Sequence, residues 1–150
     1  MKYEKLDSSN VEIYIEYLRL AMQKEPEEMT TDLIDAEKIR NNLQDPFYQQ
    51  STSILAIDDG KVLGRIEYHF YGCIQDGHRM AYVNWIYVLP EARHKGIAQK
   101  LFSLFEEECM KNDIDQYRLI RSTNPNADKF YHSFKDAELI EYPILNKYFD

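Results

Sequence analysis

At 150 residues the chain is long enough to bury one core, and nothing in it suggests a linker or a second domain. It carries 18 Lys and Arg against 26 Asp and Glu, and this net charge of −8 argues against a general nucleic-acid binder, which needs a basic face. There is no apolar run long enough to span a bilayer and no signal peptide, and the two cysteines form neither a disulfide framework nor a zinc pattern. We therefore expect a cytoplasmic protein without a metal site.

The N-terminal third is predicted to form a short strand and two helices. Residues 3–6 favour the strand. Ser9 and Glu12 have the spacing of a capping box, which predicts the start of the first helix. An acidic, proline-containing loop follows, and Thr30 or Thr31 is expected to cap the second helix.

After the second helix the apolar pattern changes to the period of strands. Asp59-Gly60 predicts a two-residue turn between strands over residues 52–58 and 61–71. A second hairpin loop leads into a long strand over residues 78–88, which is rich in β-branched and aromatic side chains.

The C-terminal part is predicted to add two helices and the closing strands. A helix that ends near Asn112 is followed by a strand over residues 117–122 and a short helix over residues 124–134. One or two strands over residues 138–149 are expected to close the sheet. The complete order is β-αα-βββ-α-β-α-β(β).

The loop after the long strand carries the clearest chemical signal. Pro90 ends the strand because it has no N–H to give to a ladder. Arg93, His94 and Lys95 add positive charge, and Gly96 lets the backbone approach a ligand closely. The free N–H groups and the positive dipole end of the next helix complete an anion site. A pyrophosphate is the ligand that this anion site fits best.

This stretch resembles the acyl-CoA-binding motif of the GNAT superfamily of N-acetyltransferases, which is Arg or Gln, two residues, Gly, one residue, then Gly or Ala. Arg93, Gly96 and Ala98 match it. Residues 124–131 resemble a second family pattern: Asn, two residues, Ala, two residues, a hydrophobe and Tyr. With the element order, the resemblance implies a single domain over residues 1–150 with the α/β (α+β) GNAT acyl-CoA N-acyltransferase fold. That fold has a mixed, mostly antiparallel central sheet flanked by about four helices.

The resemblance also implies a function, the transfer of an acetyl group from acetyl-CoA to a primary amine of a small molecule or peptide by direct attack. The residues that would hold the pyrophosphate are Arg93, His94, Lys95, Gly96, Ile97 and Ala98. In the family the preceding strand is splayed, so Ile86 and Val88 would offer their backbone to the pantetheine arm, with the Ile86 N–H as an oxyanion donor. Asn124 either contacts pantetheine or caps its helix. Tyr131 either protonates the departing thiolate or is a core aromatic residue.

The sequence departs from the family pattern where a catalytic base is expected. Many relatives place Glu or Asp midway along the strand before the motif, but residues 82–85 include no carboxylate. Asn84 would instead hold a water that relays the proton, while Glu67 and His69 are distant bases or solvated residues. A Gly-Phe pair that commonly closes the later helix is replaced by residues 135–137, Lys-Asp-Ala.

For the acceptor, the family lines one wall of the site with residues 25–35. Their carboxylates favour a cationic amine through long-range attraction, or else form a solvated loop. These are Glu25, Glu27, Glu28, Asp32 and Asp35. We expect a small amine or an aminoacyl compound, and neither nucleic acid nor membrane as a partner; a homodimer is compatible with the sequence.

A rival reading from another class is a non-catalytic acyl-CoA sensor on the same fold, which the missing carboxylate motivates. Nucleotide hydrolases, dinucleotide oxidoreductases, α/β-hydrolases and zinc proteases fit less well, because their glycine-rich, nucleophile or metal-binding motifs are absent.

Overall fold

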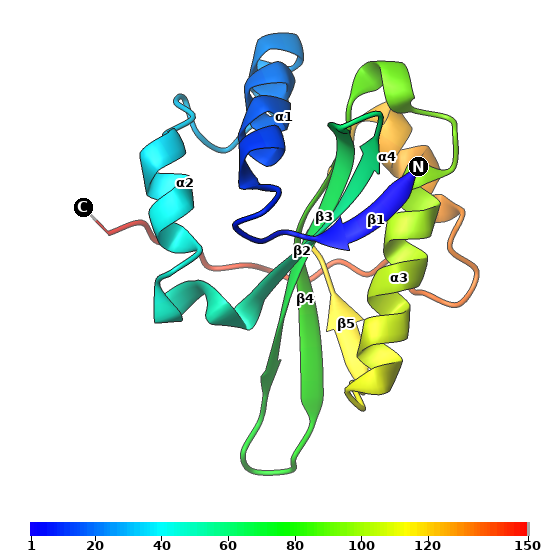
Figure 1. Cartoon of the computed structure of the whole chain (residues 1–150). Helices are drawn as coiled ribbons and strands as arrows, with labels where there is room; N and C mark the ends of the chain where they lie inside the picture. The colour runs from blue at the N-terminus through cyan, green and yellow to red at the C-terminus, as the bar shows by residue number, and fades with distance from the viewer. Residues whose placement is uncertain (150) are drawn as a thin grey trace. The chain divides into compact units, whose positions relative to one another are not determined.

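The computed structural model describes residues 1–149, which form two compact units that meet between Leu119 and Ile120 in the sequence. The first unit contains a five-stranded sheet in the order β1-β2-β3-β4-β5 (Figure 1). The strands are β1 (Lys2–Lys5), β2 (Ser51–Asp58), β3 (Lys61–Gly72), β4 (Arg79–Val88) and β5 (Gln116–Arg118). Neighbours pair antiparallel except β4 and β5, which pair parallel. The sheet is therefore mixed and mostly antiparallel, as predicted.

The helices of the first unit cover both faces of this sheet (Figure 1). They are α1 (Val11–Lys24), α2 (Ala36–Asn42) and α3 (Ile97–Lys111), with one-turn 3-10 helices at η1 (Pro26–Glu28), η2 (Pro46–Gln50) and η3 (Pro90–Ala92). Arg65 of β3 lies over the ring of Tyr14 in α1, whereas Tyr68 of β3 packs on Phe105 in α3. Because successive strand side chains alternate between faces, these contacts place α1 and α3 on opposite faces of the sheet.

The start of α1 differs from the prediction. Its N-cap is Asn10, whose side chain makes no cap hydrogen bond. The Asn10 Nδ2 donates to the Lys5 carbonyl at 2.9 Å, and its Oδ1 accepts from the Asp7 N–H at 2.9 Å. The capping box of Ser9 and Glu12 is therefore wrong, because a buried asparagine that ties β1 to the helix occupies the cap.

The second helix also begins later than predicted. Its N-cap is Asp35, whose Oδ1 accepts from the Lys38 N–H at 3.0 Å, and Asp is among the strongest cap residues. The Thr31 hydroxyl instead donates to the Leu33 carbonyl at 3.0 Å in the preceding loop, so neither Thr30 nor Thr31 caps the helix.

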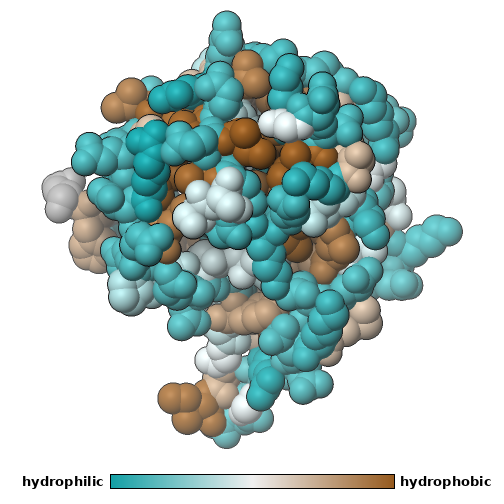
Figure 2. Space-filling model, in the orientation of Figure 1, coloured by the Kyte–Doolittle hydropathy of each residue, from teal (hydrophilic) through white to brown (hydrophobic). Residues whose placement is uncertain are grey.

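The two predicted hairpins are confirmed. Asp59 (φ 48°) and Gly60 (φ 69°) form the turn between β2 and β3, as expected for a two-residue connection with positive φ at both positions. In the loop between β3 and β4, Ile74 is fully exposed. Figure 2 shows hydrophobic atoms beside hydrophilic ones at this end of the hairpin.

The second unit contains α4 (Pro125–His132), which confirms the predicted short helix. The predicted strands over residues 138–149 are wrong, because no strand follows α4 among the described residues. Alternating apolar residues form a stable strand only against a paired edge, and Pro143 divides this segment and donates no hydrogen bond. Across residues 1–149, no helix is both long and apolar enough to cross a bilayer.

Candidate active site

One edge of β4 is open along half of its length. β4 pairs with β3 from Arg79 to Val88, but β5 pairs only with residues 80–82. The Leu89 N–H donates to the Leu63 carbonyl at 2.9 Å, and alternate residues of an antiparallel pair face the partner strand. The backbone groups of Ile86 and Val88 therefore face the other edge, where no strand of the first unit pairs with them.

A β-bulge lies just upstream of this open edge. Glu67 of β3 is opposite Trp85 and Tyr68 is opposite Val83, so Asn84 is an extra residue in β4. Asn84 is exposed, and its side chain forms no hydrogen bond within residues 1–149. Such bulges re-aim the backbone of the residues that follow, here Trp85 and Ile86.

The basic loop connects β4 to α3 through two residues in the left-handed region, His94 (φ 60°) and Gly96 (φ 78°). Gly96 is the N-cap of α3, and the first helical hydrogen bond runs from the Lys100 N–H to the Gly96 carbonyl at 3.0 Å. The N–H groups of Ile97 and Ala98 thus precede any acceptor within the helix. A Cβ at Gly96 would meet no atom within 4 Å, so the space beside this loop is open.

The start of α3 sits close to the sheet because Gly64 of β3 has no side chain. A Cβ there would approach the Val88 Cγ2 to 3.0 Å and the Ile97 Cγ2 to 3.2 Å. Ile97 is buried, whereas His94 and Lys95 are exposed. The fold therefore holds the helix start against the end of β4 and leaves the two basic side chains free to reach an anion.

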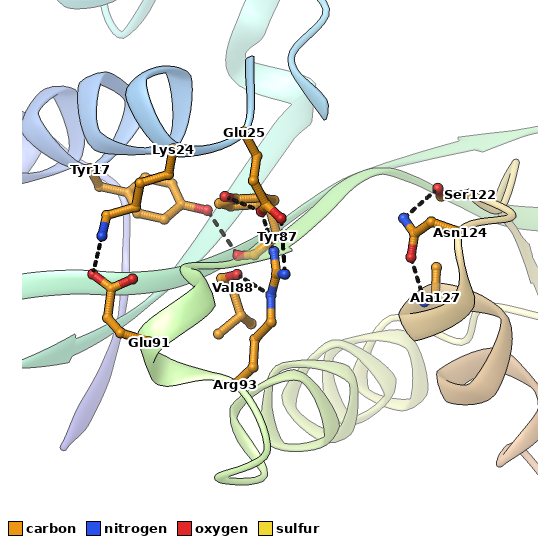
Figure 3. Close-up of polar contacts among 10 residues, drawn as sticks. All are labelled: Tyr17, Lys24, Glu25, Tyr87, Val88, Glu91, Arg93, Ser122, Asn124 and Ala127. Atoms are coloured by element: carbon orange, nitrogen blue, oxygen red, sulfur yellow. Dashed lines mark hydrogen bonds and ion pairs between the residues drawn. The ribbon is translucent and has the colours of Figure 1, made fainter. Parts of the chain in front are cut away.

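The side chain of Arg93 is used differently from those of its neighbours (Figure 3). Its Nε donates to the Val88 carbonyl at 3.0 Å, and its Nη1 and Nη2 form a bidentate ion pair with Glu25, with Nη1 to Oε1 at 3.1 Å. Its guanidinium also lies 5.5 Å from the centre of the Tyr87 ring. The Arg93 guanidinium therefore holds the basic loop in place through its contacts with Val88, Glu25 and Tyr87. The N–H groups that can bind an anion are those of the backbone at the start of α3.

Glu25 stands at the C-terminus of α1 and accepts a further hydrogen bond from the Tyr87 hydroxyl at 2.6 Å. The hydrogen bond from Arg93 is the main reason why the pKa of Glu25 is lower than usual. Burial first, and the bond to Glu25 second, raise the pKa of Tyr87. Near neutral pH, Glu25 is therefore ionised, Tyr87 is protonated and Arg93 is charged, and these are the states in which the three groups bond to one another.

Two further contacts join α1 to the end of β4 and to η3. The Tyr17 hydroxyl donates to the Tyr87 carbonyl at 2.8 Å, and Lys24 pairs with Glu91 at 3.0 Å (Figure 3). No sequence pattern predicts this network, because partners such as Glu25 and Arg93 are 68 residues apart.

We expect the Glu25–Arg93 pair to make stability depend on pH. The pKa of Glu25 is lower in the folded protein than the ~4.3 of an unfolded chain, so its contribution is complete above that value and is lost as pH falls through the folded pKa. Glu25→Gln should lower the free energy of unfolding by about 1–2 kcal/mol at pH 7, a range for a half-buried charged hydrogen bond. The deficit should shrink below about pH 4.

Urea unfolding of the variant and the wild type at several pH values measures this deficit. The matched control is Glu27→Gln, since Glu27 is exposed and two residues away. A deficit of equal size at pH 7 and pH 3 would contradict an ionic origin.

Two cavities lie on the α1 face, and Tyr14, Ile39 and Asn42 border both of them. The first, of about 410 Å³, is bordered by Arg65, Trp85 and the segment after η1. The second, of about 480 Å³, is bordered by Glu67 and the start of β2. Both belong to the first unit and offer room for an acceptor.

The structure separates the two distant base candidates. Glu67 borders the second cavity, and its Oε2 lies 3.3 Å from the Arg65 Nη1. His69 instead packs between the rings of Tyr71 and Tyr82 and borders neither cavity. Of the predicted acidic wall only Asp35 borders the first cavity, and its carboxylate caps α2.

In the second unit, Asn124 caps α4 (Figure 3). Its Oδ1 accepts from the Ala127 N–H at 2.9 Å, and its Nδ2 donates to the Ser122 hydroxyl at 3.0 Å. Tyr131 is buried, with ring centres 5.3 Å from Phe130 and 6.1 Å from Phe134. Burial raises the pKa of Tyr131, so its hydroxyl stays protonated through neutral pH. Residues 1–149 hold no cluster of three or more potential metal ligands.

Comparisons with known proteins agree with this fold. The chain has the fold of a ribosomal-protein-alanine N-acetyltransferase from Brucella melitensis biovar Abortus 2308, with a TM-score of 0.75, 19% identity, and 98% of this chain and 100% of that chain covered. It is similar to an aminoglycoside acetyltransferase from an uncultured soil metagenomic sample in complex with sisomicin (TM-score 0.75, 17% identity, 97% and 96% covered). It is also similar to a predicted acetyltransferase with acetyl-CoA from Clostridium acetobutylicum (TM-score 0.69, 16% identity, 97% and 95% covered).

Comparison with curated protein sequences gives no match. The sequence profile of the Acetyltransferase (GNAT) family, however, matches residues 11–135, which is most of the chain and includes both stretches that resemble family motifs. The protein therefore belongs to the GNAT family of acetyltransferases.

Proposed function

We propose that the protein is an N-acetyltransferase that moves an acetyl group from acetyl-CoA to a primary amine by direct attack. The observation that carries this proposal is the continuity of two features in the first unit. The open edge of β4 at Ile86 and Val88 runs directly into the left-handed loop and the free N–H groups of α3. An extended pantetheine arm and its pyrophosphate need these two features in this order. One similar structure contains acetyl-CoA, and the others are named as acetyltransferases of protein or aminoglycoside substrates.

The donor side of the proposed site is built mainly from backbone. The N–H groups of Gly96, Ile97 and Ala98 would bind the pyrophosphate, with the His94 and Lys95 side chains adding positive charge. The Val88 N–H would pair with pantetheine, since the Val88 carbonyl already accepts from Arg93. Arg93 acts as a positioning residue for this loop.

The chemical step needs charge stabilisation, the loss of two protons from the ammonium nitrogen and the gain of one proton by the thiolate. The Ile86 N–H, directly after the bulge, would donate to the carbonyl oxygen as negative charge develops there. Tyr131, which stays protonated, would give its proton to the departing thiolate. The ammonium nitrogen must lose one proton before attack and a second one after it, and Asn84 would hold the water that carries both protons to solvent.

The family match spans both structural units, from residue 11 to residue 135. We therefore propose that the chain is one acetyltransferase domain.

Acetyl-CoA should raise the melting temperature. At a ligand concentration about 100-fold above Kd, linkage adds about 2.7 kcal/mol, which is a rise of roughly 5–10 °C for a chain of this size. Thermal unfolding with acetyl-CoA, with CoA and with ATP at equal concentration measures it, and ATP should give a much smaller shift. No shift at millimolar acetyl-CoA would overturn the donor assignment.

A CoA-release assay against a panel of amines then tests catalysis. Acceleration by at least one amine supports the transferase. A protein that binds acetyl-CoA tightly but releases no CoA with any amine would instead be an acyl-CoA sensor, the reading that the missing carboxylate in β4 allows.

A further inference from the structure

Arg65 is a buried charge beside the first cavity. It lies in the middle of β3 and is only 7% exposed, yet it borders the 410 Å³ space together with Tyr14 and Trp85. A buried guanidinium is costly unless its donors are paired, so its partners decide what it does.

Only part of the Arg65 guanidinium is satisfied by the protein. Its Nη1 donates to the Tyr14 hydroxyl and lies 3.3 Å from the Glu67 Oε2. The Nε is buried without any hydrogen-bond partner, and Nη2 donates no hydrogen bond within residues 1–149. Nε and Nη2 form one edge of the planar fork, and two parallel N–H groups on one edge match the two oxygens of a carboxylate.

Aromatic rings hold this fork in place. The guanidinium carbon lies 5.2 Å from the centre of the Tyr14 ring and 5.7 Å from that of Trp85. These contacts fix the plane of Arg65, which reduces the entropy lost when a ligand binds. Trp85 is also the residue directly before Ile86, so the cavity begins beside the proposed oxyanion donor.

The charges around the cavity do not favour the purely cationic amine that the acidic loop suggested. Glu25 is paired with Arg93, and Glu27 and Asp32 are exposed and do not border the cavity. Asp35 is the one acidic residue on its border, beside the two cations Arg65 and Lys38.

We propose that the acceptor is a small amine that carries a carboxylate, that is, an amino acid, and that the Nε and Nη2 edge of Arg65 binds this carboxylate. The inference rests on the proposed function. In the reaction the ammonium nitrogen loses one proton to water, forms a bond to the acetyl carbon and loses a second proton to water. The carbon–sulfur bond breaks, and the thiolate takes a proton from Tyr131, which regains one from solvent. The carboxylate is unchanged, so the product is an N-acetylamino acid that keeps its negative charge.

The test compares each amino acid with its own amide in the CoA-release assay. The amide presents the same amine and side chain but no negative charge. We expect kcat/KM for the best amino acid to exceed that of its amide by at least about 10²-fold, the scale of a lost bidentate charged contact. Equal rates for acids and amides, or a preference for polyamines, would overturn the inference and leave the transferase intact.

Variants of Arg65 test whether this residue causes the preference for amino acids over their amides. Arg65→Lys and the volume-conserving Arg65→Met should raise KM for amino acids with much smaller effects on kcat and on the amides. Arg40→Lys is the matched control, because Arg40 is an arginine of α2 that pairs with Glu12 and borders neither cavity. If the Arg65 variants keep the wild-type preference, the inference is wrong.

The acetyl-CoA melting shift is measured on every variant, and its retention shows that each is folded. The comparison of acids with amides on the wild-type protein decides the case even if both Arg65 variants fail to fold. Absence of the shift in the wild type would overturn the proposed function, a result distinct from acetylation without acid preference.

Discussion

Replacing Gly96 with glutamate is expected to abolish acetyl-CoA binding in a protein that still folds. A Cβ at Gly96 meets no protein atom within 4 Å, so the new side chain would extend into the open space beside the helix start. Its carboxylate would oppose a pyrophosphate at the proposed cradle, where the N–H groups of Ile97 and Ala98 attract anions. We expect Kd for acetyl-CoA to rise at least about 10²-fold, and the ligand-induced melting shift to disappear.

The chain contains a close control for this substitution. Gly60 has φ 69° against 78° at Gly96, and a Cβ there also meets nothing within 4 Å. Gly60→Glu therefore introduces the same charge and a similar left-handed strain of about 1–2 kcal/mol, but at the turn between β2 and β3. Gly60→Glu should melt earlier and keep the full acetyl-CoA shift. Wild-type affinity in Gly96→Glu would show that the donor binds elsewhere.

Tyr131→Phe is expected to lower kcat by about 10²–10⁴-fold, the usual contribution of a positioned general acid, while Kd for acetyl-CoA stays nearly constant. The substitution removes only the hydroxyl and keeps the ring among Phe130 and Phe134. Because burial raises the pKa of Tyr131, wild-type activity should not fall through its ionisation until pH exceeds the ordinary tyrosine value of ~10.

Tyr117→Phe is the corresponding control. Burial also raises the pKa of Tyr117, and its hydroxyl donates to Glu106 at 2.9 Å. Loss of that bond should cost about 1 kcal/mol of stability without changing turnover. Unchanged turnover in Tyr131→Phe would remove this tyrosine from the chemistry.

The parts of the fold that the sequence predicted well depend on neighbours in the chain. The turn at Asp59 and Gly60 needs only two residues that accept positive φ. The N-cap of α1 was harder to predict, because the Asn10 side chain forms hydrogen bonds with Lys5 and Asp7. No sequence pattern for helix starts encodes those contacts. The closing strands failed for a related reason, since a strand needs a partner edge that its own residues do not specify.

In the candidate site, too, the features that neighbours in the chain define were predicted and those that depend on distant contacts were not. Its donor half is a strand edge, a glycine and a helix start that follow one another along the chain, so a short motif predicts it. The groups around the first cavity meet only after folding, because Arg65 and Tyr14 are 51 residues apart. The bulge at Asn84 was also missed, since its extra residue is defined by the pairing with β3.

The ion pair between Glu25 and Arg93 has a consequence for protein engineering. The segment most attractive for directed evolution of acceptor choice is residues 29–35, which borders the first cavity and begins four positions after Glu25. A library that also randomises Glu25 would remove the ion pair of Arg93 and loosen the basic loop between β4 and α3. Many clones would then lose activity, whichever acceptor they prefer. Libraries should keep Glu25 fixed, so that loss of activity in a clone does not come from release of Arg93.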